Sequence, residues 1–170
     1  MAGSEASPGV LGSPSVERVA RALRAAGIES PIVELPGAAH TAKLAAQFLG
    51  CELGQIANSL VFRGVATHGA ILVMSSGARR VDMARLAAVA GEEIGKADAD
   101  FVRAATGLAI GGVAPVGHTG RLRTFVERSL AAWPEIWAAA GHPNTVFRLT
   151  YAELVRITAG EEVDVAEPRR

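Results

Sequence analysis

The pattern of apolar and polar positions predicts helices and strands interspersed along the chain. Val16, Val19 and Leu23 follow helical spacing, with Ser13 as a cap before them. Four further helices are predicted where a capping residue precedes an apolar, helix-periodic stretch. They lie between Thr41 and Gly50, between Asp82 and Gly91, from Asp98 or Asp100 to Gly107, and after Thr150, which forms a capping box with Glu153.

The strands are predicted from short alternating or continuous apolar runs. Residues 56–63 alternate, a turn follows at 64–69, and residues 70–75 form a second run, which together predict a hairpin. Shorter strands are predicted at 32–35, 124–126, 136–139 and 145–149. A regular alternation of strand and helix is absent, so we predict a mixed α/β (α+β) fold with a mixed, largely antiparallel sheet and flanking helices.

The length of 170 residues suits a single domain, which can bury a sizeable core without disulfides or metals. We assign this domain to residues 14–166. Residues 1–13 are rich in Gly, Ser, Ala and Pro and are expected to form a flexible leader, and residues 167–170 a frayed tail.

Charge and composition exclude or disfavour several classes of function. The 17 basic residues balance the 17 acidic ones, which disfavours a protein that coats duplex DNA through many phosphates. No apolar run approaches the roughly 18 residues of a membrane span. The single cysteine, Cys51, has no internal partner for a disulfide and fits a reducing compartment, so we expect a cytoplasmic protein.

Most recognisable catalytic constellations are absent. The four histidines are far apart in the sequence, and the chain lacks paired Cys or His at metal spacing, a G-x-S-x-G elbow, a P-loop and a dinucleotide fingerprint. Cys51 has no signature around it and is interpreted as a buried or incidental thiol, not as a nucleophile. Arg79, Arg80, Arg85, Arg121 and Arg123 offer local phosphate contacts or are ordinary surface arginines.

Three features stand out, each with a structural alternative. Residues 111–118 (GGVAPVGH) form a glycine-dense loop suited to placing backbone N–H groups against a ligand, or a tight turn. Residues 140–145 (AGHPNT) form either a site loop or a hairpin turn. Asn58 falls on the same strand face as Ile56, Leu60 and Phe62, so its amide is either satisfied in the core or directed into a pocket.

In this order, the segments resemble the YbaK/ProX family of aminoacyl-tRNA deacylases and prolyl-tRNA synthetase-associated editing domains. The resemblance covers about residues 16–165. It is carried by His40–Thr41–Ala42, by residues 56–62 (IANSLVF), by Ala97–Asp98 through Thr106–Gly107, by the loop 111–118, and by the turn at Ala140–Gly141 with the closing helix around Leu154.

The resemblance implies hydrolysis of the ester that joins a wrong amino acid to the 3′ end of a tRNA, with tRNA(Pro) as the expected carrier. The reaction would take place in trans, on a protein separate from the synthetase. The pocket is expected over the sheet, with Gly111 and Gly112 holding the aminoacyl group, and no metal or organic cofactor. The implied partners are the aminoacyl-tRNA 3′ end and a prolyl-tRNA synthetase. Thr41, Gly117, Gly141 and Asn144 complete the candidate substrate-binding residues.

One departure from the family concerns Asn58, which stands where deacylases of the family usually have a lysine. Asparagine keeps two N–H donors but lacks the charge and the reach. The alternative to an enzyme is therefore a binding module of the same fold, which recognises aminoacyl-tRNA ends, an amino-acid derivative or a synthetase without turnover. The candidate catalytic residues are Asn58, His118 and His142.

Overall fold

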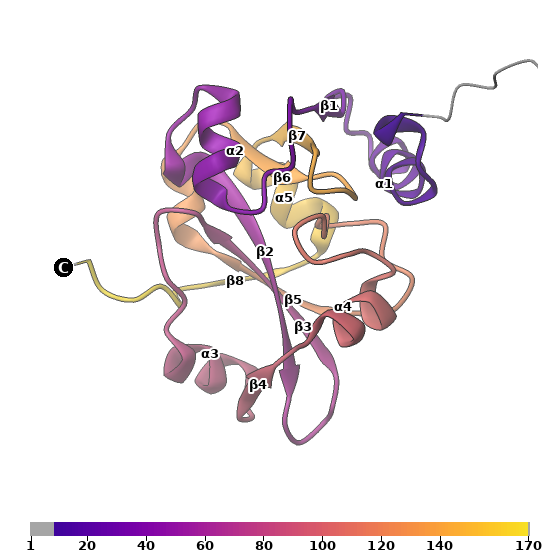
Figure 1. Ribbon diagram of the computed structural model, residues 1–170. Coiled ribbons are helices and arrows are strands. Elements are labelled where there is room, and N and C mark those ends of the chain that lie inside the picture. Colours follow the sequence, from indigo (N-terminus) through magenta and orange to yellow (C-terminus); the bar gives the residue numbers. More distant parts are fainter. Residues whose placement is uncertain (1–8, 170) are drawn as a thin grey trace, which may run out of the picture.

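The computed structural model describes residues 9–169. It contains a mixed sheet with helices on both faces (Figure 1). The helices are α1 (Pro14–Ala25), α2 (Ala42–Leu49), α3 (Met83–Ala90), α4 (Ala99–Thr106) and α5 (Tyr151–Thr158), with short 3-10 helices η1 (Val10–Gly12), η2 (Leu53–Gln55) and η3 (Arg128–Ala132). The strands are β1 (Val33–Glu34), β2 (Ile56–Gly64), β3 (Ala70–Ser76), β4 (Ile94–Lys96), β5 (Arg123–Glu127), β6 (Ile136–Ala139), β7 (Thr145–Leu149) and β8 (Glu161–Val163).

The strand order is β1-β7-β6-β2-β3-β5-β8, and β4 pairs additionally with β2. The predicted hairpin of β2 and β3 is confirmed, with Asn58 opposite Ser75 and Phe62 opposite Ile71. The β1–β7, β2–β3, β2–β4 and β6–β7 pairs are antiparallel, whereas β2–β6, β3–β5 and β5–β8 are parallel. The predicted mixed sheet of an α/β domain is therefore confirmed.

The helix ends follow the predicted capping residues. The Ser13 hydroxyl accepts a hydrogen bond from Val16 N–H, and Thr41, Asp82 and Asp98 cap α2, α3 and α4 in the same way. Thr150 and Glu153 form a capping box at the start of α5. These bonds satisfy N–H groups that lack a partner inside the helix, so each helix begins where its cap stands.

Alternation along β2 divides the core between the two faces of the sheet. Ala57 and Val61 pack on the face covered by α1, α4 and α5. Leu60 and Phe62 belong to the opposite face, where α3 covers Ile71, Val73 and Phe125, and Ile56 there meets α2. Helices thus pack on both faces of the sheet, while residues 58–62 of the central strand β2 stay half-buried.

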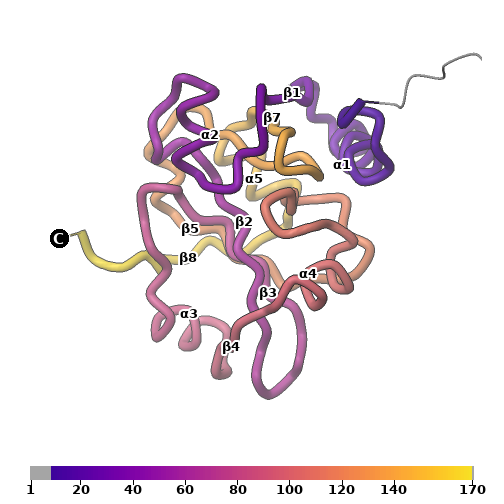
Figure 2. The backbone as a smooth tube through the Cα atoms, viewed as in Figure 1, coloured from indigo at the N-terminus to yellow at the C-terminus, as the bar shows by residue number. Residues whose placement is uncertain are grey.

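The glycine-rich loop penetrates the core instead of lying on the surface. Leu108, Val113 and Ala114 are fully or almost fully buried. Figure 2 shows this loop between α1 and α4, beside β2. The Arg18 side chain of α1 fixes it, because its Nε donates to the Gly117 carbonyl at 2.8 Å and its Nη2 to the Gly107 carbonyl at 2.9 Å.

Parts of the two expected terminal segments lie within the described residues. Residues 10–12 of the expected leader form η1, and residues 1–8 lie outside the described part. Of the expected tail, Glu167 donates its main-chain N–H to the Arg80 carbonyl, just after Ala166 pairs with Val81. The short strands β4 and β8 were not predicted from the sequence. Within residues 9–169, no helix is both long and apolar enough to cross a bilayer.

Candidate functional site

A gap in the sheet lies along one edge of β2. On this edge, β6 pairs only with Ile56 and Ala57, and β4 pairs only with residues 62–64. Within the part of the chain that the structure describes, residues 58–61 therefore have no partner strand on this side. Unpaired main-chain groups of a strand remain available to water or a ligand.

A cavity of about 90 Å³ occupies the first half of this gap, and we call it the reaction cavity. The start of α2, β2, β6, β7 and the glycine loop enclose it. Its lining combines small apolar side chains with a few polar ones: Ala39, His40, Thr41, Ala42, Ala45, Ile56, Ala57, Asn58, Ser59, Gly111, Val113, Trp137, Ala138, Ala139, Pro143, Thr145 and Val146. The cavity therefore lies where the neighbouring strands β2, β6 and β7 meet α2 and the glycine loop.

Asn58 lines the reaction cavity and is half-buried. Its backbone pairs with Ser75 of β3, which fixes the position of its Cα. No side-chain hydrogen bond joins its carboxamide to another residue in the described range. Asn58 is not among the residues with a fully buried, unpartnered side-chain polar atom, so its carboxamide is open to water or a ligand in the cavity.

The start of α2 forms another wall of the cavity. Thr41 lines it, but its hydroxyl already accepts the N–H of Leu44 at 3.2 Å as the helix cap. His40, the preceding residue, also lines the cavity and is exposed. We did not single it out as a candidate site residue, although it belongs to the His40–Thr41–Ala42 segment that carries the family resemblance.

The first two glycines of the loop have different positions. Gly111 lines the reaction cavity with a φ of 88°, a conformation that favours glycine. Gly112 lies behind it, where an added Cβ would be 2.7 Å from the Cα of His142. The Gly112 N–H donates to the Ala109 carbonyl at 2.9 Å, so it is engaged in the turn. Gly111 is thus the loop glycine that faces the cavity.

His118 is not among the residues that line the cavity. Its Nε2 donates to the Ala114 carbonyl at 2.6 Å, which closes the loop on itself. Burial lowers the pKa of His118 below its ordinary value, and the nearby Arg18 charge acts in the same direction, while the bond to Ala114 opposes them. The neutral imidazole is therefore favoured in the folded protein.

Of the 141–144 turn, Pro143 lines the cavity, and the other three residues are not among the lining. His142 Nδ1 accepts the main-chain N–H of Asn144 at 3.0 Å, and the Asn144 carbonyl accepts the N–H of Leu35. Gly141 (φ 107°) and Gly117 (φ 80°) both pack against Val19 of α1. The structure thus brings three of the candidate residues, Asn58, Thr41 and Gly111, to the cavity. The other six do not line it and belong to the two neighbouring loops: Gly112, Gly117, His118, Gly141, His142 and Asn144.

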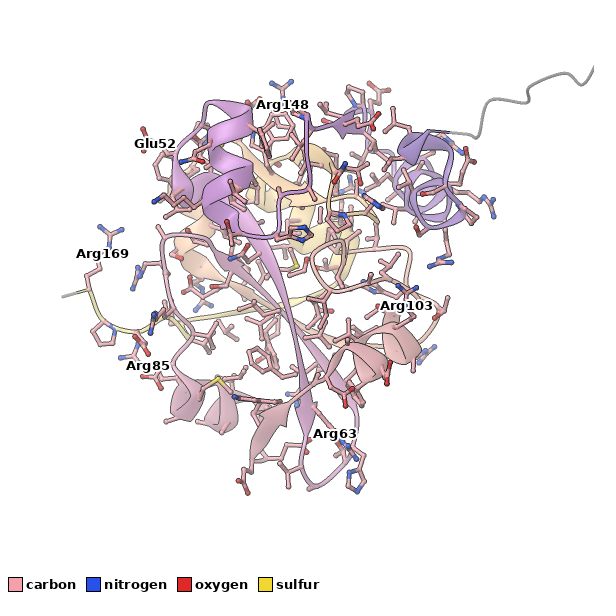
Figure 3. The ribbon with its side chains drawn as sticks, in the orientation of Figure 1. Glu52, Arg63, Arg85, Arg103, Arg148 and Arg169 are labelled. Carbon is pink, nitrogen blue, oxygen red and sulfur yellow. The ribbon has the colours of Figure 1, made fainter. Side chains whose placement is uncertain are left out.

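The reaction cavity is electrically neutral apart from His40, the one titratable side chain of its lining. Figure 3 shows Glu52, Arg63, Arg85, Arg103, Arg148 and Arg169 pointing outward at the periphery of the molecule. Among the described residues, no three His, Cys, Asp or Glu side chains gather as metal ligands. Burial raises the pKa of the Cys51 thiol, which leaves it protonated and weakly nucleophilic.

Three of the five arginines proposed for phosphate contacts hold chain segments together. Arg79 donates to the carbonyl of Glu167 and Arg85 to that of Ala166. Arg123 donates to the last carbonyls of α3 and lies over the ring of Phe125, 4.8 Å from its centroid. These contacts favour the interpretation of Arg79, Arg85 and Arg123 as structural residues.

Comparisons with known proteins find relatives that match most of the chain. The aminoacyl-tRNA editing domain profile matches residues 37–157, which contain the complete cavity lining. The uncharacterized protein YwhH of Bacillus subtilis is 29% identical over 126 residues, covering 74% of this chain and 80% of its own.

Three solved structures share the fold. A protein provisionally described as a trans-editing enzyme for prolyl-tRNA synthetase is 43% identical, with a TM-score of 0.86 over 92% of this chain and 99% of its own. A scaffold from computational epitope grafting is 41% identical, with a TM-score of 0.85 over the same shares, 92% and 99%. The hypothetical protein APE2540 is 26% identical, with a TM-score of 0.82 over 88% and 99%. With the profile spanning most of the chain, this protein belongs to the family of aminoacyl-tRNA editing domains.

Proposed function

We propose that this protein hydrolyses the ester between a small amino acid and the 3′ end of a transfer RNA. It acts in trans, as a protein separate from the synthetase. Family membership supports the substrate class. The observation that carries the proposal is the Asn58 carboxamide, which is half-buried at the reaction cavity and has no hydrogen-bonding partner among the described residues. A cavity that contains such an amide is suited to binding a polar group of a substrate.

Hydrolysis of this ester requires only a few protein groups. Water attacks the ester carbonyl carbon, the carbonyl oxygen becomes an oxyanion, and the ester bond breaks with its oxygen leaving as a ribose hydroxyl. The N–H groups of Asn58 serve as donors to the oxyanion, and Gly111 lets the backbone approach the substrate. His40 is the side chain of the lining that can accept and donate a proton, together with the neighbouring ribose hydroxyl.

Cavity size favours small amino acids. A volume of about 90 Å³ with Ala42, Ala45 and Ala138 in its walls suits alanyl, seryl, cysteinyl or threonyl groups. The relative described in connection with prolyl-tRNA synthetase favours tRNA(Pro) as the carrier and that synthetase as the partner. An amino acid wrongly attached to tRNA(Pro) is then the substrate to test first.

A second candidate function rests on the same residue. Because Asn58 replaces a lysine that is usual in deacylases of the family, the chain is alternatively a module that binds aminoacyl-tRNA ends without turnover. An uncharged amide cannot provide the electrostatic stabilisation of an ammonium group. The two candidates predict different results for the same substitutions.

The test measures release of labelled amino acid from tRNA(Pro) charged with alanine, serine, threonine or cysteine. We expect release by the unmodified protein and a decrease of about 10²–10³-fold in kcat for Asn58→Ala, the usual cost of removing an oxyanion donor. Gln47→Ala is the matched control, because this amide is exposed on α2 and does not line the cavity.

The outcomes separate the two candidates. Turnover that falls in Asn58→Lys supports a mechanism adapted to a neutral amide. Turnover that appears only in Asn58→Lys, with tRNA binding present in both proteins, supports the binding module. Absence of both release and tRNA binding with all four esters contradicts both functions.

A further inference from the structure

The hydroxyl group of Ser75, on β3, is exceptional among the described residues. It holds the one buried side-chain N or O atom between residues 9 and 169 that has no hydrogen-bonding partner. The Ser75 side chain is 0% exposed and does not line the reaction cavity. A buried hydroxyl without a partner costs free energy, so we looked for a group that can bind it.

The register of the central hairpin places Asn58 opposite this hydroxyl. Three successive cross-strand pairs lie on one face of the hairpin: Phe62 with Ile71, Leu60 with Val73, and Asn58 with Ser75. The first two pairs are apolar and belong to the cluster under α3. The third pair is polar, and its Asn58 lines the reaction cavity. Side chains directly opposite each other in such a pair have Cβ atoms about 4.5–5.5 Å apart, so the hydroxyl and the carboxamide are within reach of one another.

The other polar side chains near the end of β3 are already engaged. The hydroxyl of Ser76, the next residue along the strand, donates to a main-chain carbonyl of η2 at 2.9 Å. The carboxylate of Glu127, at the end of β5, accepts the N–H and the hydroxyl of Ser129. The Asn58 carboxamide makes no side-chain hydrogen bond in the described range, which leaves it as the partner for Ser75.

We propose that Ser75 orients the Asn58 carboxamide. Its hydroxyl donates to Oδ1 of Asn58, and both N–H groups of Nδ2 then face the reaction cavity. A carboxamide has a donor end and an acceptor end of nearly the same shape, and its terminal torsion turns over a broad range. A fixed donor next to the oxygen therefore decides which end a ligand meets. Ser75 is a positioning residue, because it acts through Asn58.

The inference rests on the proposed function, in which the N–H groups of Asn58 donate to the oxyanion. If Ser75 instead accepted a hydrogen bond from Nδ2, the partial negative charge of Oδ1 would face the oxyanion and oppose the reaction. Donation by the hydroxyl is thus the arrangement that supports oxyanion stabilisation. A lysine at position 58 would have donors alone and would need no such partner. An asparagine at this position does need one, and Ser75 provides it.

Double-mutant kinetics test the coupling of the two residues. Ser75→Ala removes the hydroxyl and keeps the strand pairing. We expect kcat for ester release to fall about fivefold with KM unchanged, because one hydrogen bond of about 1 kcal/mol no longer holds the amide. In the Asn58→Ala background, the same substitution should lower kcat no further. An equal fall in both backgrounds overturns the proposal, since Ser75 then acts through another group.

Two further variants separate positioning from packing. Ser75→Cys fills the space of the serine side chain with a much weaker donor, so kcat should stay low. Full recovery of kcat in this variant would mean that lost volume caused the effect of Ser75→Ala, and overturns the proposal. Ser76→Ala is the matched control, because it removes a buried hydrogen bond from the opposite face of β3. It should lower the melting temperature and leave kcat of the folded protein unchanged, and a fall of kcat equal to that of Ser75→Ala overturns the proposal.

The carboxamide can also be observed without chemistry. The chain has two asparagines, Asn58 and Asn144, so the Cγ signal of Asn58 in asparagine-labelled protein is assigned by its absence in Asn58→Ala. This signal should move upfield in Ser75→Ala, because its oxygen loses a donor, and should stay in place in Ser76→Ala. If no ester is released but the signal responds to Ser75→Ala alone, the proposed hydrolysis fails and the positioning pair stands. If ester release depends on Asn58 while neither kcat nor the Cγ signal responds to Ser75→Ala, the positioning role fails and the hydrolysis stands.

Discussion

At the scale of single residues, Gly112 determines how closely the loop approaches the 141–144 turn. An added Cβ would lie 2.7 Å from the Cα and 2.8 Å from the N of His142. Both atoms belong to the backbone, which cannot move aside like the end of a flexible side chain. The absence of a side chain at this position therefore permits the packing that holds Gly111 at the reaction cavity.

We predict that Gly112→Ala lowers the free energy of unfolding by about 1–3 kcal/mol, the usual cost of overpacking, and reduces ester release at the same time. Urea denaturation followed by circular dichroism measures the first effect. Gly95→Ala is the matched control, because its added methyl group would meet Val65 at an ordinary 3.5 Å. Equal stability of the two variants contradicts close packing of the loop on the turn.

The residue scale also shows what the sequence can predict about a site. The strand alternation placed Asn58 on a defined face, and the glycine content identified the loop from which Gly111 lines the cavity. The hydrogen bonds of His118 and His142 are different, since both rings bind main-chain groups of their own loops. These bonds depend on loop conformation, which has no periodic signal in the sequence.

At the scale of elements, α1 supports both loops behind the cavity. Gly117 and Gly141 pack against its backbone at Val19 and Ser15, and Arg18 donates to the carbonyls of Gly107 and Gly117. The guanidinium group thus joins the end of α4 to the end of the glycine loop. An arginine suits this position, because its fork of donors reaches two acceptors at once.

We predict that Arg18→Met lowers the free energy of unfolding by about 1–3 kcal/mol, because two carbonyls lose a charged donor. Amide hydrogen exchange of residues 108–118 should become faster than that of the β2–β3 hairpin. Arg21→Met, on the exposed side of the same helix, should change neither property. A uniform increase of exchange across the whole chain would instead mean that Arg18 acts on global stability alone.

Elements were predictable where their ends carry a chemical signal. The five helices each have a side-chain cap, and four of them end at a residue in the left-handed conformation, three times a glycine. The strands β4 and β8 have three residues each, and Glu161 and Glu162 give β8 no apolar alternation. Such strands exist because a neighbouring strand pairs with them, so they depend on tertiary structure.

At the scale of the whole molecule, the strand order creates the site. The parallel pairs join strands far apart in the sequence, such as β2 with β6 and β3 with β5. Local patterns give no register for such pairs, so the sequence predicted a mixed sheet but not its order. The gap between β6 and β4 follows from that order. The cavity lies beside this gap, where β2, β6 and β7 meet α2 and the glycine loop.

Stability of the whole molecule should depend on pH through His118. Burial holds the pKa of His118 in the folded protein below its ordinary value of 6.5, with Arg18 as the charged neighbour. The unfolded chain therefore binds a proton more readily than the folded one. Both states are neutral at His118 well above pH 6.5, and stability falls as the pH decreases from there to the folded-state pKa, below which the loss is complete.

We predict a lower melting temperature at about pH 5.5 than at about pH 7.5, and a smaller difference between the two in His118→Gln, which keeps an N–H donor but does not titrate. Glu92 does not interfere, because hydrogen bonds from Thr67 and Ala66 place its pKa below 4.5, outside this range. His68→Gln is the matched control, since this histidine is exposed in the β2–β3 turn and should leave the difference unchanged. If His118→Gln keeps the full pH dependence, the proton that destabilises the fold is bound elsewhere, and the buried loop histidine is not the group that makes this fold sensitive to acid.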